Sequence, residues 1–103
     1  MNNLDKKDYY NILFSYYKNL LTLKQQDMFT SYYEEDYSLG EIAESMNVSR
    51  NAVYDALKKC ENLLDSYEEK LGLYKDALKR KELYQKYYND NTKDLIEKLE
   101  EME

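Results

Sequence analysis

The chain of 103 residues lacks proline, histidine and tryptophan, and it has only two glycines and one cysteine. With no proline and so few glycines, the sequence offers few points at which a helix must end. The single cysteine, Cys60, cannot form an internal disulfide, which is typical of a reduced, cytoplasmic protein. No apolar run is long enough to span a bilayer, and the amino terminus lacks a signal peptide, so no membrane insertion is expected.

Residues suited to catalysis or to metal binding are equally scarce. Without histidine, and with a cysteine at an apolar position, no metal site or nucleophile–base pair can be assembled from the sequence, and no phosphate-binding loop is present. We therefore expect a protein that is not an enzyme, with no catalytic residues, no bound metal and no cofactor.

Acidic residues outnumber basic ones, and the formal net charge is −6. This excess disfavours strong nonspecific binding to nucleic acid, because cation–phosphate contacts supply most of that affinity. Residues 38–60 are neutral, with three basic and three acidic side chains, whereas residues 61–103 carry twelve acidic and eight basic ones. The composition weighs against DNA binding without excluding it.

Thirteen tyrosines accompany only two phenylalanines. One interpretation is that tyrosine supplies the large apolar groups of a thin helical protein while its hydroxyl stays in water. The other interpretation is that some of these rings stack on the bases of a nucleic acid. The sequence leaves both open.

The stretch from Ser38 to Lys59, SLGEIAESMNVSRNAVYDALKK, predicts two short helices around a tight turn. Ser38 and Glu41 have the spacing of a capping box. Asn47 tolerates the left-handed backbone of a sharp turn, and Ser49 can cap the second helix. The side chains expected to face inward are apolar: Leu39, Ile42, Ala43, Met46, Val48, Ala52, Val53, Ala56 and Leu57. This is the pattern of a helix-turn-helix, whose second helix can enter the major groove of DNA.

Two further helices are expected before this motif. Asp5 can cap a helix that runs to about Leu21, and Thr22 with Gln25 forms another capping box that begins a helix near Leu23. Acidic residues 34–36 predict a connector, because negative charge is unfavourable at a helix carboxy terminus. We expect the two helices to cover the apolar back of the motif, and the alternative is a docking surface for another protein.

An apolar seam continues beyond the motif at alternating spacings of three and four. Its members are Leu57, Cys60, Leu64, Tyr67, Leu71, Tyr74 and Leu78. Either the amino-terminal helices cover this seam, or it forms a homodimer or binds a partner. Gly72 lies inside the seam and can kink or break it.

The local charge becomes positive between Lys70 and Lys86. Four basic residues there, Lys75, Lys79, Arg80 and Lys81, are candidate contacts for RNA phosphates or for an acidic protein surface, and the alternative is a solvated helix face. The stretch of residues 89–91 is expected to end this helix, and Thr92 is expected to cap a last one.

These residues resemble known families at two levels. The segments LKQQDMF and YSLGEIAESMNVSRNAVYDAL are similar to region 4 of bacterial sigma factors, where a helix-turn-helix reads promoter DNA. More of the chain, roughly residues 4 to 88, resembles the small YlxM family of bacterial proteins in order and spacing. The resemblance implies an all-α fold, a helix-turn-helix of the winged-helix-type superclass without a wing, followed by a long helical extension.

The resemblance to YlxM proteins also implies a function, since genes of that family commonly lie beside those of the signal recognition particle. We expect a non-catalytic adaptor or regulator that binds the RNA of this particle or its GTPase. The alternative is a sequence-specific DNA-binding transcriptional regulator. The sigma-like resemblance would place nucleic-acid contacts on the outward side of the second motif helix, at Ser49, Arg50, Asn51, Tyr54 and Lys58.

Two regions are expected from the sequence. Residues 1–66 would contain the amino-terminal helices and the motif at 38–59, and residues 67–103 would form a helical extension that is not an independent domain.

Overall fold

A computed structural model describes residues 5–103 of the chain, and the described part contains helices and connections with no strand. The helices are α1 (Lys6–Tyr17), η1 (Lys18–Leu20), α2 (Leu23–Phe29), η2 (Thr30–Glu34), α3 (Leu39–Met46), α4 (Arg50–Leu71), α5 (Leu73–Tyr87) and α6 (Lys93–Glu101). The predicted all-α class is confirmed. The chain divides into two compact units, Met1–Gly72 (unit 1) and Leu73–Glu103 (unit 2).

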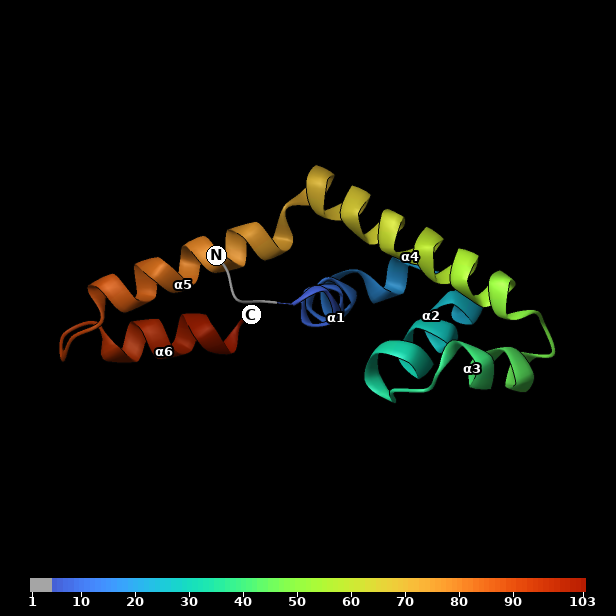
Figure 1. Cartoon of the computed structure of the whole chain (residues 1–103). Helices are drawn as coiled ribbons and strands as arrows, with labels where there is room; N and C mark the ends of the chain where they lie inside the picture. Colours follow the sequence, from blue (N-terminus) through green and yellow to red (C-terminus); the bar gives the residue numbers. More distant parts are fainter. Residues whose placement is uncertain (1–4) are drawn as a thin grey trace. The chain divides into compact units, whose positions relative to one another are not determined.

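In unit 1, the helices α1, α2 and α3 all pack against α4 (Figure 1). Three stacked rings lie within this arrangement: the ring centres of Phe14 and Phe29 are 4.4 Å apart, and those of Phe29 and Tyr33 are 4.2 Å apart. The other buried apolar side chains of the unit are Leu13, Tyr17, Leu21, Met28, Ile42, Ala43, Val53, Leu57, Cys60 and Leu64. The predicted covering of the motif by the first two helices is therefore observed.

The predicted helix starts of unit 1 are observed at their caps. The carboxylate of Asp5 accepts from the backbone N–H of Asp8 at 2.8 Å and caps α1. Thr22 and Gln25 form the expected capping box at the start of α2. These bonds join residues three apart, so a short stretch of sequence suffices to specify them.

The second helix ends at the acidic residues 34–36, where a connector was predicted, but its last turn is not α-helical. The helix continues past Phe29 as a π-helix, η2, in which the N–H of Glu35 donates to the carbonyl of Thr30 at 3.0 Å. A left-handed residue, Asp36 with φ 59°, then reverses the chain toward α3. The wider turn of a π-helix is uncommon and is often found at functional sites.

Helix α4 is continuous through residues 66 and 67, the boundary expected from the sequence, and it ends at Leu71. Gly72 follows with φ 63°, a left-handed conformation that favours glycine, and its N–H donates to the carbonyl of Glu68 at 2.8 Å. Of the two predicted effects of Gly72, a kink or a break in the apolar seam, the structure shows the break.

Unit 2 is a hairpin of α5 and α6 around the turn at residues 88–92. The turn lies where it was predicted, but the hydroxyl of Thr92 does not cap α6. It donates to the carbonyl of Tyr87 at 2.5 Å. The side chain of Asn89 instead accepts from the N–H groups of Asn91 and Thr92, at 2.8 and 3.1 Å.

Candidate nucleic-acid interface

The helix-turn-helix predicted at residues 38–59 is present in α3 and α4. Ser38 and Glu41 form both bonds of the capping box, at 3.0 and 2.8 Å. Asn47 is left-handed, with φ 57°, and the hydroxyl of Ser49 caps α4 by accepting from the N–H of Ala52 at 3.0 Å. Each of these local predictions is confirmed.

The predicted set of inward-facing side chains is partly wrong. Val48 is 39% exposed and Ala52 is exposed, whereas Ile42, Ala43 and Val53 are buried at the crossing. The backbone closes the turn instead, because the N–H of Val48 donates to the carbonyl of Ala43 at 3.0 Å.

Five predicted contact residues lie at the amino-terminal part of α4, and all five are exposed. They are Ser49, Arg50, Asn51, Tyr54 and Lys58. Positions 50, 54 and 58 follow one another at intervals of four, so the structure places them on one side of the helix. Val53 and Leu57 lie three residues after Arg50 and Tyr54, on the adjoining face of the helix, and they are buried in the core.

The two helices of the motif also carry exposed acidic groups. Asp55 is exposed on α4, and Glu41 and Glu44 are exposed on α3. Hydrogen bonds from the backbone and the side chain of Ser38 hold the pKa of Glu41 below its ordinary value, so it is ionised at neutral pH. The motif surface therefore has mixed charge.

The second predicted basic patch lies on α5, in unit 2. Lys75, Lys79 and Lys81 are exposed, but Arg80 is half-buried. The Nε atom of Arg80 lies 3.1 Å from a carboxylate oxygen of Glu103, and this partner raises the pKa of the guanidinium. An incoming phosphate would compete with Glu103 for Arg80.

The predicted partner seam is divided by burial. Leu57, Cys60 and Leu64 are buried in the core of unit 1 at 4%, 0% and 0% exposure, so they offer no surface to a partner. Tyr67 is half-buried, and its hydroxyl donates to the carbonyl of Leu20 at 3.3 Å. The remaining members are Leu71 and Leu78, which are exposed, and Tyr74, which is half-buried.

Sequence reasoning missed a cluster around Glu61, a carboxylate that is only 6% exposed. The hydroxyl of Tyr33 donates to one of its oxygens. The ammonium groups of Lys6 and Lys58 lie 3.4 and 3.6 Å from the other. Burial, and then the bond to Glu61, raises the pKa of the Tyr33 hydroxyl. Lys6 and Tyr33 lie far from Glu61 in the sequence, so no local pattern announces the cluster.

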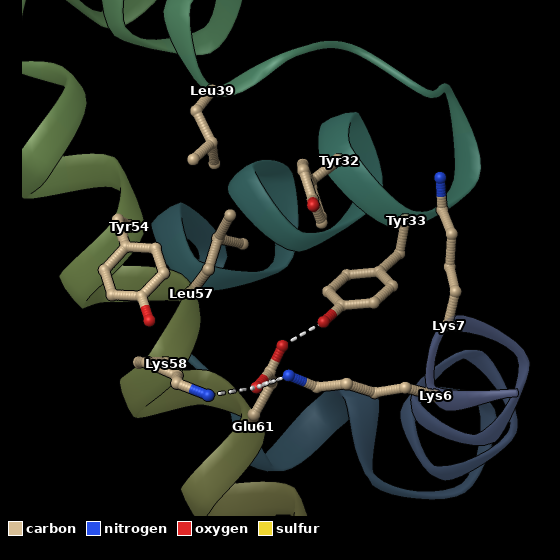
Figure 2. A pocket seen from close by; sticks show the side chains of 9 residues that line it. All are labelled: Lys6, Lys7, Tyr32, Tyr33, Leu39, Tyr54, Leu57, Lys58 and Glu61. Atoms are coloured by element: carbon tan, nitrogen blue, oxygen red, sulfur yellow. Dashed lines mark hydrogen bonds and ion pairs between the residues drawn. The ribbon is translucent and has the colours of Figure 1, made fainter.

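This cluster forms part of a pocket of about 260 Å³ in unit 1 (Figure 2). We call it the Glu61 pocket. It is lined by Lys6, Lys7, Tyr32, Tyr33, Leu39, Tyr54, Leu57, Lys58 and Glu61. Tyr54 and Lys58 belong to both this pocket and the predicted contact side of α4. The pocket therefore adjoins the motif surface.

Residues 5–103 contain neither a metal-binding cluster nor a membrane-spanning helix. Within that range there is no group of three or more cysteine or acidic side chains able to hold a metal ion. No helix in the same range has the length and apolar character needed to cross a membrane.

Comparison with known proteins identifies relatives over most of the chain. A protein from Lactococcus lactis is 46% identical over 104 residues, covering 97% of this chain and 92% of its own. One from Bacillus velezensis is 50% identical over 84 residues, covering 82% of this chain and 76% of its own. One from Listeria monocytogenes is 40% identical over 108 residues, covering 96% and 98%. All three are called UPF0122 proteins.

A family model matches residues 4–102, and its description reads "Putative helix-turn-helix protein, YlxM / p13 like". The match confirms the resemblance to YlxM proteins and extends it to the last helix. The helix-turn-helix seen in α3 and α4 agrees with this description. The chain belongs to the UPF0122 family of YlxM/p13-like helix-turn-helix proteins.

Proposed function

We propose that this protein is a non-catalytic regulator that acts with the bacterial signal recognition particle in the cytoplasm. It binds the RNA of the particle, or its GTPase, through the exposed side of α4. The observation that carries the proposal is the exposure of Arg50, Asn51 and Tyr54 on a helix whose adjoining face, with Val53 and Leu57, is buried. These three side chains are not packed into the core, so they are available to a ligand. The choice of this particle follows from the resemblance to YlxM proteins.

The charge of the motif supports RNA or protein over duplex DNA as the partner. Asp55 lies among the predicted contact residues of α4, and the other helix of the motif, α3, carries the exposed Glu41 and Glu44. A protein that follows a duplex through its phosphates needs several cations on one surface. A mixed surface is better suited to a folded RNA or to a protein, where fewer phosphates are contacted together.

A second candidate is a sequence-specific, DNA-binding transcriptional regulator. Its support is the geometry of the motif, in which Arg50 and Asn51 occupy the first turn of the second helix. In helix-turn-helix proteins these early positions contact base edges. An arginine there can pair with guanine and an asparagine with adenine.

Fluorescence anisotropy titrations at physiological salt distinguish the candidates. Labelled signal recognition particle RNA, alone and loaded with its GTPase, is compared with random and promoter-derived duplex DNA. The protein is tested as the natural chain, as Arg50→Glu and as Lys24→Glu. Lys24→Glu is a matched control, because Lys24 is also an exposed cation in the first turn of a helix, α2, away from the motif.

We expect saturable binding to the RNA or the loaded particle, weakened about tenfold or more by Arg50→Glu and little changed by Lys24→Glu. Preferential binding to one duplex, with a steep dependence on salt, would favour the transcriptional regulator instead. Equal losses in the two variants would mean that α4 is not the contact surface.

A further inference from the structure

The Glu61 pocket brings two cations to the same point on the surface. Lys6 comes from α1 and Lys58 from α4, and their Nζ atoms approach the same oxygen of Glu61, as Figure 2 shows. Their side chains are nevertheless 62% and 47% exposed. Two ammonium groups share one carboxylate, so one positive charge remains in excess at the edge of the pocket. A single phosphodiester group carries the charge that balances it.

The rest of the pocket is aromatic and apolar. In Figure 2, Leu39 and Leu57 lie between Tyr54 on one side and Tyr32 on the other. Tyr54 lines the pocket and is 51% exposed, so its ring is accessible to a ligand. Tyr32 is half-buried, and the ring centres of Tyr32 and Tyr33 are 5.0 Å apart in an edge contact. A flat group that enters here meets an aromatic ring and aliphatic side chains.

The size of the pocket restricts the ligand. About 260 Å³ is less than the roughly 300–1,000 Å³ of pockets for drug-sized ligands. One planar ring system with a small charged substituent suits this volume. A nucleobase linked to its phosphate has these properties, and aromatic side chains are the usual platforms for unstacked bases.

We propose that the Glu61 pocket receives a single unpaired nucleotide of an RNA, with the base against Tyr54 and the phosphate on Lys6 and Lys58. The inference rests on the proposed function, since it concerns the same nucleic-acid surface, and it specifies which part of an RNA is recognised. A paired base is held inside its helix and cannot enter, so loops, bulges and ends are the targets. Glu61 acts as a positioning residue, because it draws the two lysines together.

The carboxylate of Glu61 accepts a hydrogen bond from the Tyr33 hydroxyl and also pairs with the two ammonium groups. The carboxylate is therefore compensated and does not repel a phosphate as a bare charge would. Attraction to Glu61 also raises the pKa of Lys6, which keeps that ammonium charged.

The test compares a short, labelled, mixed-sequence RNA as a single strand and annealed to its complement. Anisotropy titrations use the full chain and two matched pairs of variants. Tyr54→Leu removes the ring of the pocket, whereas Tyr37→Leu removes a similarly exposed ring, 47%, that does not line it. Lys58→Gln removes a cation of the pocket, whereas Lys59→Gln removes its exposed neighbour. Circular dichroism verifies that each variant is folded.

We expect the single strand to bind more tightly than the duplex. Tyr54→Leu should weaken its binding by about tenfold, with little change for Tyr37→Leu, and Lys58→Gln should weaken it more than Lys59→Gln. Crosslinking of a 4-thiouridine-containing strand to the peptide that contains Tyr54 would give a second, independent readout. Equal binding of the two RNA forms, or equal losses in Tyr54→Leu and Tyr37→Leu, would overturn the proposal.

Failure of this inference is distinguishable from failure of the proposed function, because Arg50 does not line the pocket. Loss of particle RNA binding on Arg50→Glu, without loss on Tyr54→Leu, would remove the pocket and keep the function. Equal affinity for particle RNA and random RNA, with loss of binding on Tyr54→Leu, would keep the pocket and remove the proposed function. Absence of all RNA binding would remove both.

Discussion

Unit 1 and unit 2 are both built from amphipathic helices, but they differ in what these helices bury. Thirteen of the fourteen buried apolar side chains among residues 5–103 lie in unit 1, and only Ile96 lies in unit 2. In unit 1 three helices surround the apolar side of α4, whereas unit 2 is a single pair. Two helices cannot enclose a core between them, so their outer apolar positions remain in contact with water.

In unit 2, polar side-chain contacts join the two helical segments. The hydroxyl of Tyr88 donates to Glu97 at 3.1 Å, and Arg80 pairs with Glu103. Such exposed contacts each contribute little to stability. The exposed apolar side chains of this unit are Leu73, Leu78, Leu83, Tyr87, Tyr88, Leu95, Leu99 and Met102. The comparison shows that periodicity alone does not produce a core, because a third element must cover the pair.

The largest effect should come from comparing two leucines of the same seam. Leu64 is fully buried in unit 1, whereas Leu71, two turns later on α4, is 53% exposed. We expect Leu64→Ala to lower the free energy of unfolding by about 2–5 kcal/mol, because it leaves a cavity. Leu71→Ala should change it by less than about 0.5 kcal/mol. Urea denaturation followed by circular dichroism measures both, and similar losses would show that the exposed part of the seam is covered in solution.

An effect of about 1–3 kcal/mol is expected at Glu61, the buried carboxylate of unit 1. Glu61→Gln removes the charge that holds Lys6 and Lys58 and weakens the bond from Tyr33. Glu69→Gln, an exposed change on the same helix, is the control. Thermal unfolding at neutral pH measures the difference between them. A Glu61→Gln variant as stable as Glu69→Gln would show that the buried charge is replaceable.

A smaller effect, about 1 kcal/mol, is expected at the junction between the units. Gly72 has φ 63°, and an added Cβ would meet no atom closer than 4.0 Å. Gly72→Ala therefore costs the strain of a left-handed alanine and no steric clash. Gly40→Ala, in the first turn of α3, should instead be neutral or stabilising. Urea denaturation compares the two, and stabilisation by Gly72→Ala would mean that α4 can extend through the junction.

The smallest effect concerns the pH dependence of the cap at Glu41. Its pKa is below the ordinary value near 4.5 because it accepts hydrogen bonds from Ser38. A folded-state pKa that is lowered adds stability above the unfolded-state pKa, and this stability is lost as pH falls through the folded-state value. Glu41→Gln keeps a capping side chain without a charge.

The stability advantage of the natural chain over Glu41→Gln should therefore decrease as the pH is lowered from 6 toward 3. Urea denaturation at several pH values measures it. An advantage that is constant with pH would show that the charge of Glu41 adds nothing to its hydrogen bonds. Solvent exposure of this side chain keeps the expected difference small.

The helix boundaries of the motif could be predicted from the sequence because the interactions that specify them are local. The capping bonds of Thr22, Ser38 and Ser49 all reach the residue three positions later. The left-handed turn at Asn47 depends on the conformational preference of one side chain. A few neighbouring residues contain all the information that these features need.

Burial along the seam could not be predicted in the same way. Leu64 and Leu71 have equivalent positions in the pattern, and only the packing of α1 and α2 against α4 makes one of them core. Val48 also matches an apolar pattern but stays exposed, because backbone hydrogen bonds close the turn without it. A periodic pattern records which side of a helix is apolar, and it does not record whether anything covers that side.

The sequence by itself determined the all-α class, the helix-turn-helix, the family, and the exposure of the five residues predicted to contact nucleic acid. Tertiary structure alone decided the Glu61 pocket, because Lys6 and Tyr33 reach Glu61 from 55 and 28 positions away. It also decided that Gly72 ends the core-forming part of the chain. The physical reason is distance along the chain: caps and turns join near neighbours, whereas burial and charge pairing depend on segments that only folding brings together.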